Sequence, residues 1–214
     1  MNSNLFDRYF HPDLQLSTSR VLLRCMQPSD LEVFKSLDTD ANTWKYFTKD
    51  LSIESEMNEW IGEALTAYVK KLRMPFTIVE KETNLVCGTS SYANISWYDK
   101  RLEIGWTWLA NPFLGTGINQ HAKFAMLSYA FEVMEMERVE IKTDNLNERA
   151  KAALVKVGMT PEGVLRSHMQ MHSNRRRDSI YFGMLKHEWQ ERRSGETEKQ
   201  RNRETEKQRN GDQH

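Results

Sequence analysis

The stretch that decides the fold is residues 102–129, which read LEIGWTWLANPFLGTGINQHAKFAMLSY. It begins with an apolar, aromatic run of strand length, Leu102–Leu109, and this run ends before Pro112. Two glycines, Gly115 and Gly117, then precede a segment whose apolar residues recur at helical spacing. A strand, a glycine turn and a helix in this order present the N–H groups of the first helical turn to an anion.

Neither of the two common nucleotide-binding motifs fits this turn. The dinucleotide motif G-x-G-x-x-G requires a third glycine where this chain has Gln120. The P-loop requires a second glycine and a lysine at fixed offsets, and the residues after Gly115 supply neither. A glycine pair alone is also compatible with a plain tight turn before a core helix, so the surrounding sequence has to decide.

Residues 103–119 resemble the acetyl-CoA-binding segment of the GNAT superfamily of N-acetyltransferases, and most of all its Rim-type branch, which acetylates the N-termini of ribosomal proteins. The superfamily motif Q/R-x-x-G-x-G/A falls on residues 114–119. Leu114 replaces the usual Gln or Arg, and Asn119 replaces the usual small residue. Neither change removes a backbone donor, and the family binds the diphosphate mainly through main-chain N–H groups. The resemblance covers residues 16–189.

The resemblance implies acetyl-CoA as co-substrate, bound by the strand end, the glycine bend and the start of a later helix. The implied residues are Trp108, Leu109, Ala110, Leu114, Gly115, Thr116, Gly117, Ile118, Asn119 and Asn147. The first three pair with the pantetheine arm through their backbone, and the bend binds the diphosphate. Asn147 either donates to a pantetheine carbonyl or caps its own helix, and the two roles are compatible.

The order of the expected elements indicates an α/β (α+β) fold. Three antiparallel strands are expected between residues 75 and 109. Strand Arg138–Thr143 follows the long helix, and a helical crossover requires it to run parallel to Leu102–Leu109. A hairpin within residues 164–185 ends the domain. We therefore expect a GNAT-like mixed, mostly antiparallel sheet with a central parallel strand pair and helices on both faces.

Composition divides the chain into three parts. Residues 1–15 form an N-terminal extension, residues 16–191 one acetyltransferase-like domain, and residues 192–214 a polar tail. The tail contains GETEKQRN followed by RETEKQRN, with almost no apolar residue, so we expect it to be disordered. A weakly helical, charge-paired extension or tether is the alternative.

Charge and hydropathy argue against several classes of protein. Lys and Arg number 30, as do Asp and Glu, and this zero net charge does not favour binding to nucleic-acid phosphates. There is no signal-peptide pattern and no apolar run of ~18 residues for a membrane span. Cys25 and Cys87 fit no metal or redox spacing. We expect a cytoplasmic protein, with monomer and homodimer both open.

Glu103 is the predicted catalytic base. It is the only charged residue between Leu102 and Leu109, on a strand otherwise suited to burial. A buried carboxylate is costly unless it is hydrogen-bonded or faces a wet cleft. Burial is expected to raise its pKa toward a value useful for proton abstraction, directly or through water, because a carboxylate with a higher pKa is a stronger base. Many GNAT enzymes carry a glutamate at a similar point. The alternative is that Glu103 pairs with an arginine or faces solvent at the end of the sheet.

The acid that protonates the leaving thiolate is unassigned. Rim-type enzymes often have a serine where this chain has Ala150, and no Tyr lies between Asn147 and Gly158, so water is a candidate. No metal site is expected, because on a strand His168 and His172 lie ~13 Å apart. His168 remains a candidate for the wall of the acceptor cleft. Residues 175–177, three consecutive arginines, are expected to form a solvated turn.

Three functional hypotheses follow. The first is an acetyl-CoA-dependent N-acetyltransferase whose acceptor is a protein N-terminus or a small primary amine. The second is a non-catalytic acyl-CoA-binding or regulatory module on the same fold. The third is a structural interaction protein that uses the repeat tail. No motif in the sequence identifies the acceptor.

Overall fold

The computed structural model describes residues 2–194 and shows one eight-stranded sheet of order β1-β2-β3-β4-β5-β6-β8-β7. The strands are β1 (Gln15–Ser17), β2 (Val21–Cys25), β3 (Arg73–Glu80), β4 (Val86–Ser96), β5 (Arg101–Leu109), β6 (Arg138–Asp144), β7 (Thr160–Gln170) and β8 (Arg176–Leu185). The helices are α1 (Asn2–Tyr9), α2 (Asp30–Ser36), α3 (Ala41–Trp44), α4 (Glu54–Val69), α5 (Ile118–Ser128) and α6 (Glu148–Val157), with a further helix at 186–194.

Strand pairing confirms the predicted topology. All neighbouring strands are antiparallel except β5 and β6, which are parallel. The crossover between these two strands contains α5, which continues as one π-helical segment, Tyr129–Val133. The mixed sheet and its central parallel pair therefore follow from the helical crossover, as the sequence predicts.

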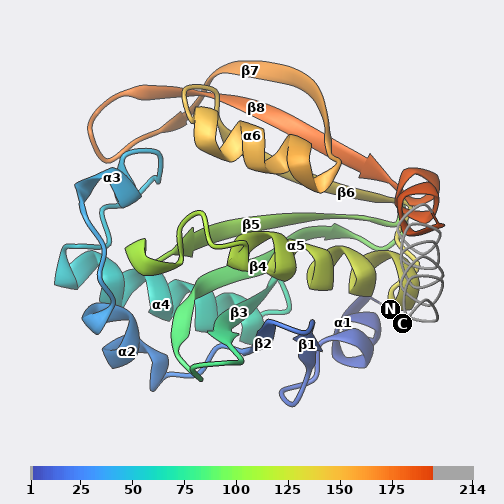
Figure 1. Ribbon diagram of the computed structural model, residues 1–214, viewed down its shortest axis with the longest axis horizontal. Coiled ribbons are helices and arrows are strands. Elements are labelled where there is room, and N and C mark those ends of the chain that lie inside the picture. The colour runs from blue at the N-terminus through green and yellow to red at the C-terminus, as the bar shows by residue number, and fades with distance from the viewer. Residues whose placement is uncertain (1, 195–214) are drawn as a thin grey trace, which may run out of the picture.

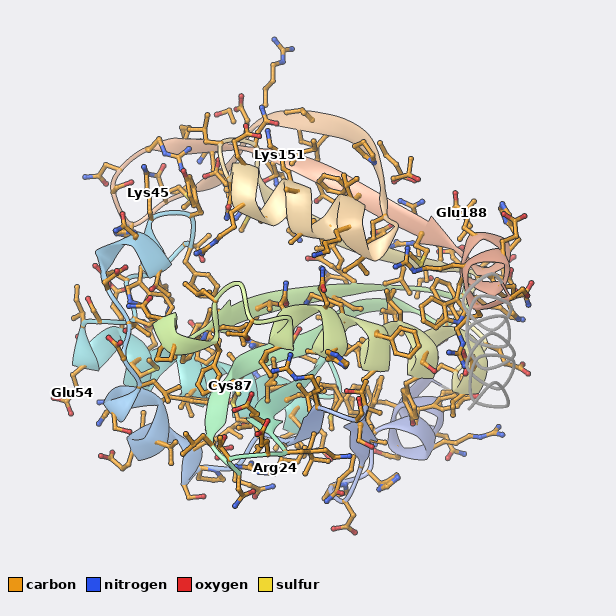
Figure 2. The ribbon with its side chains drawn as sticks, in the orientation of Figure 1. Arg24, Lys45, Glu54, Cys87, Lys151 and Glu188 are labelled. Carbon is orange, nitrogen blue, oxygen red and sulfur yellow. The ribbon has the colours of Figure 1, made fainter. Side chains whose placement is uncertain are left out.

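Helices cover both faces of the sheet (Figure 1). Side chains of α1, α5 and α6 pack into one core with alternate residues of the strands, such as Leu102 and Ile104. Side chains of α2, α3 and α4 pack into a second core with Trp108. Figure 2 shows Cys87 inside the molecule and Glu54 at its edge. β5 thus supplies both cores, and Trp108 lies on the opposite face from Leu102 and Ile104 because the strand alternation is shifted by one residue between Gly105 and Trp108.

The N-terminal segment belongs to the folded unit. Phe6 of α1 and Phe10, the residue that follows this helix, are buried in the core. Phe10 stacks on Tyr92 of β4. At the other end, Trp189 in helix 186–194 stacks on Phe131. The predicted disorder concerned residues 192–214; residues 192–194 are the end of helix 186–194, and residues 195–214 lie outside the described residues. Within residues 2–194, no helix is long and apolar enough to cross a membrane.

Candidate active site

The parallel strands β5 and β6 separate at Glu103. Their ladder consists of three residue pairs and ends with Glu103 opposite Glu140. Beyond that point β5 continues along β4 to Leu109, while β6 continues along β8 to Asp144. One edge of each strand therefore loses its partner. The predicted pantetheine residues Trp108, Leu109 and Ala110 follow this separation, and all are buried.

A β-bulge at Trp106 changes which side chains of β5 share a face. Trp106 and Thr107 together oppose Ser90 of β4, and Trp106 has a positive φ of 52°. After the bulge Thr107 faces α5, whereas the Trp106 ring lies 4.5 Å from the guanidinium of Arg73 on the other face. Bulges occur often beside active sites because they re-aim side chains. No sequence pattern indicated this bulge, because Trp rarely adopts positive φ.

The glycine bend lies at the N-terminus of α5, as predicted. Gly115 (φ 77°) and Gly117 (φ 94°) both have left-handed backbone, and Gly117 is the N-cap residue without a side-chain cap. Gly115 and Thr116 are exposed, and among the described residues no partner is recorded for the N–H groups of Gly115, Gly117 or Asn119. Ile118 N–H makes only a long 3.5 Å contact with Thr116 Oγ1. The bend is thus open to an anion.

Arg20 places a cation at this bend, and no sequence pattern indicated it. Nη1 of Arg20, which precedes β2, donates to the carbonyl oxygen of Thr116 at 2.7 Å. The same atom lies 3.3 Å from where a Cβ on Gly117 would stand. Arg20 also pairs with Glu80 at 3.4 Å. A guanidinium therefore supplements the helix N-terminus at the place where Leu114 offers no charge.

Glu103 is buried and held by two partners. Its side chain accepts from Lys142 Nζ, which lies 2.6 Å from both carboxylate oxygens, and Oε2 accepts from Asn94 Nδ2 at 2.9 Å. Glu103 is 4% exposed. Pairing with an arginine was the alternative to the role of base, and the structure shows a pairing of this kind with a lysine in place of the arginine.

Glu103 lies on the wall of a hollow of about 940 Å³. The hollow is also lined by Asn94, Trp97, Lys142, His168 and Tyr181. His168, a candidate for the wall of the acceptor cleft, lines this hollow, and its ring meets the Tyr181 ring edge-on at 5.8 Å. The sequence did not indicate Lys142 or Tyr181. They face the hollow because β6 and β8 pair in a register that places them opposite each other.

A buried lysine lies behind the same strand. Lys123 of α5 is 3% exposed, and its Nζ donates to Thr107 Oγ1 at 2.6 Å and to Ser90 Oγ at 3.1 Å. No ion pair is recorded for it in the described part of the chain. Burial lowers the pKa of Lys123 to about 7. The amine is therefore partly neutral at physiological pH.

Asn147 caps α6, as predicted for one of its two roles. Its Oδ1 accepts from Ala150 N at 3.0 Å, so only its amide nitrogen remains to donate to a ligand. No Ser, Thr or Tyr lies on α6 itself, Glu148–Val157. The acid for the thiolate remains unassigned on this helix.

The three consecutive arginines correct one prediction. Only Arg176 is exposed, whereas Arg177 is 7% exposed and Arg175 pairs with the fully buried Asp144. The expectation of a solvated turn was wrong because these residues begin β8, whose register with β6 places Asp144 directly opposite Ser179. Buried charge is therefore concentrated next to the hollow.

Comparison with known proteins identifies the family. Residues 20–160 match the model of the acetyltransferase (GNAT) domain, which is more than half of the chain. The chain belongs to the GNAT acetyltransferase family. The predicted resemblance to the GNAT superfamily is thereby confirmed.

Other GNAT proteins align with this chain to different extents. "Putative ribosomal N-acetyltransferase YdaF" of Bacillus subtilis (strain 168) is 33% identical over 105 residues, which cover 49% of this chain and 56% of that protein. The chain therefore spans little more than half of that relative. "Uncharacterized N-acetyltransferase p20" of Bacillus licheniformis is 28% identical, covering 81% of this chain and 97% of that protein. An acetyltransferase crystal structure from T. thermophilus has a TM-score of 0.73 at 28% identity, covering 82% of this chain and 90% of that one.

Proposed function

We propose that this GNAT protein transfers an acetyl group from acetyl-CoA to a primary amine, with Glu103 as the base. One observation carries the proposal: β5 leads from the strand separation at Glu103 directly to the open glycine bend at α5. The bend and Arg20 suit a diphosphate, and the separated strand edges offer backbone groups to an extended arm. The family supports a thioester donor, and the names of its relatives support a nitrogen acceptor.

The residues of the hollow suggest how transfer proceeds. The neutral amine attacks the thioester carbonyl carbon, a C–N bond forms, and the C–S bond then breaks. Glu103 accepts the proton that the amine nitrogen loses, directly or through water, while Lys142 and Asn94 hold its carboxylate in place. The acid that protonates the leaving thiolate is unassigned, and water is the candidate because α6 offers no hydroxyl group.

A second candidate function is a non-catalytic acyl-CoA-binding module. The observations that favour it are the bidentate hold of Lys142 on Glu103 and Ala150 in the place where relatives often have a serine. A sensor of this kind retains the glycine bend and binds the donor without turnover. Its acceptor hollow then has no catalytic purpose.

Two measurements on the full chain separate these candidates. Calorimetric titration with coenzyme A tests the bend, and release of free thiol from acetyl-CoA in the presence of pooled amines and peptides tests transfer. We expect both binding and amine-dependent thiol release. Binding with no thiol release across the panel contradicts the enzyme and supports the module, and absence of binding contradicts both.

A further inference from the structure

A group of polar side chains next to the hollow has hydrogen-bonding atoms without partners. Strand register places the group on the same face as Glu103: Glu103 lies opposite Glu140, and Glu140 lies opposite Gly183 of β8. Because side chains alternate along a strand, Ser179 and Arg177 point to this face as well. The ladder between β6 and β8 is regular from Arg138 to Asp144, which lies opposite Ser179. Beyond it, β7 carries extra residues between Leu165 and Met169, while only Asp178 separates Ser179 from Arg177 on β8.

The charges on this face do not balance. Lys142 is bonded to Glu103, and Arg175 is bonded to Asp144. This leaves Arg177, for whose side chain no hydrogen bond or ion pair is recorded within residues 2–194. A buried cation normally has a carboxylate partner, because removing it from water is costly. Asp144 and Glu103 act on Arg177 electrostatically, but no carboxylate among the described residues forms a hydrogen bond or ion pair with it.

Three buried polar atoms of this group have no hydrogen-bond partner in the described part of the chain, and one of them belongs to Arg177 itself. Arg177 Nε, Ser179 Oγ and His168 Nδ1 are buried, with no hydrogen-bond partner among the described residues. Arg177 is 7% exposed and Ser179 is fully buried. His168 and Lys142 line the same hollow. Burial lowers the pKa of His168, and the positive charges of Lys142 and Arg177 lower it further. Unpaired buried donors are rare unless a ligand completes them.

The charge of the predicted base, Glu103, also affects the pKa of Arg177. Burial lowers the pKa of Arg177, while the negative charges of Asp144 and Glu103 raise it. Arg177 and Glu103 lie on the same face of the sheet by strand register, and no hydrogen bond between them is recorded among the described residues. A ligand that carries an anion to Arg177 is then well placed to present another of its groups to Glu103.

We propose that the acceptor is a small amine that also carries a carboxylate, an amino acid, and that Arg177 binds this carboxylate while the amine faces Glu103. The inference rests on the proposed function and names its substrate class. A guanidinium suits a carboxylate because its N–H groups form parallel hydrogen bonds to both oxygens. The hydroxyl group of Ser179 supplies a further donor. Lys142 remains bonded to Glu103, so the acceptor carboxylate does not compete for it.

The test compares matched acceptors and matched variants. Thiol release from acetyl-CoA is measured with a panel of α- and ω-amino acids, each paired with its carboxamide, and rates are calculated per unprotonated amine. We expect wild-type protein to prefer the acids in kcat/KM. Arg177→Met should lower kcat/KM for the acids by about 10- to 100-fold, as for lost hydrogen bonds to a charged group, and leave the carboxamides nearly unchanged.

Two further variants control for folding and for charge. Arg176→Met removes the exposed neighbour and should preserve the preference for acids. Arg177→Lys should restore part of it. Coenzyme A titration of each variant reports whether the donor site is intact, so a misfolded Arg177→Met protein is recognised. In that case the preference for acids over carboxamides is compared between wild-type protein and Arg177→Lys.

Three results would overturn the inference. Equal kcat/KM for acids and carboxamides in wild-type protein would contradict an amino acid as the acceptor, but it would not contradict acetyl transfer to an amine. Weaker coenzyme A binding by folded Arg177→Met assigns Arg177 to the donor. Absence of thiol release with every amine overturns the proposed function, and the inference with it.

Discussion

Lys142 Nζ lies 2.6 Å from both carboxylate oxygens of Glu103, and this pair joins β5 and β6 where the two strands part. Both residues are largely buried, so neither charge is well hydrated. An ion pair in such a position contributes little net stability but is costly to break, because one charge is left alone. The pair therefore fixes the position of the Glu103 carboxylate.

Substituting Lys142→Met should destabilise the protein by about 3–5 kcal/mol and reduce the transfer rate at neutral pH. Without the ammonium, the buried carboxylate of Glu103 loses the partner that holds it in position. Lys142→Arg should retain much of the rate. The measurements are urea unfolding and kcat/KM for thiol release. Loss of stability with unchanged kcat/KM would show a purely structural role.

Substituting Glu103→Gln should lower kcat by about 10²- to 10⁴-fold, the usual contribution of a general base, and leave the dissociation constant of coenzyme A unchanged. The matched control is Asp30→Asn, which also removes a buried, ion-paired carboxylate but lies on α2 beside Arg24. The control should lose stability and keep kcat. Thiol release and calorimetry give both quantities, and an unchanged kcat for Glu103→Gln would exclude its role as the base.

Gly117→Ala should weaken coenzyme A binding and destabilise the protein by roughly 1–2 kcal/mol, because a non-glycine residue at φ 94° is strained. Its Cβ would also approach Arg20 Nη1 to 3.3 Å. Gly62→Ala in α4 is the control, since nothing lies within 4 Å of its Cβ and alanine suits a helix. Thermal unfolding and titration with coenzyme A check both variants. Unchanged affinity in Gly117→Ala would argue against the bend as the diphosphate site.

Arg20→Gln should raise the dissociation constant of coenzyme A and make it less dependent on salt, because one cation near the diphosphate is lost. Binding of pantetheine, which lacks the diphosphate, should not change. Lys81→Gln is the control, since its amine donates to the carbonyl oxygen of Thr18 and no contact with the bend is recorded for it among the described residues. Equal weakening of coenzyme A and pantetheine would show that Arg20 only shapes the bend.

Lys123 should make stability depend on pH. Its pKa is about 7 in the folded protein against 10.5 for a free side chain, so between these values the unfolded chain binds a proton that the folded chain does not. The free energy of unfolding therefore rises with pH from about 7 upward, by at most ~1.4 kcal/mol per pH unit. Lys123→Met should be more stable than wild type at pH 7, and the difference should shrink by pH 9. A constant difference would contradict the lowered pKa.

The sequence by itself determined the order of the elements and the glycine bend. Apolar periodicity marked β5 and α5, and the breaker at Pro112 and the two glycines marked the turn between them. The parallel pairing of β5 with β6 followed from the helical crossover alone. These features are local or follow from chain connectivity, so no knowledge of distant contacts is needed to predict them.

Only the tertiary structure decided how charges meet. Lys142 is 39 residues from Glu103, and Arg20 is 96 residues from Thr116, so no local pattern connects either pair. The bulge at Trp106 and the burial of Arg177 depend on strand register, which is set by packing across the whole sheet. Side-chain chemistry is written in the sequence, but whether a charge is buried, paired or left unpaired depends on which strands become neighbours.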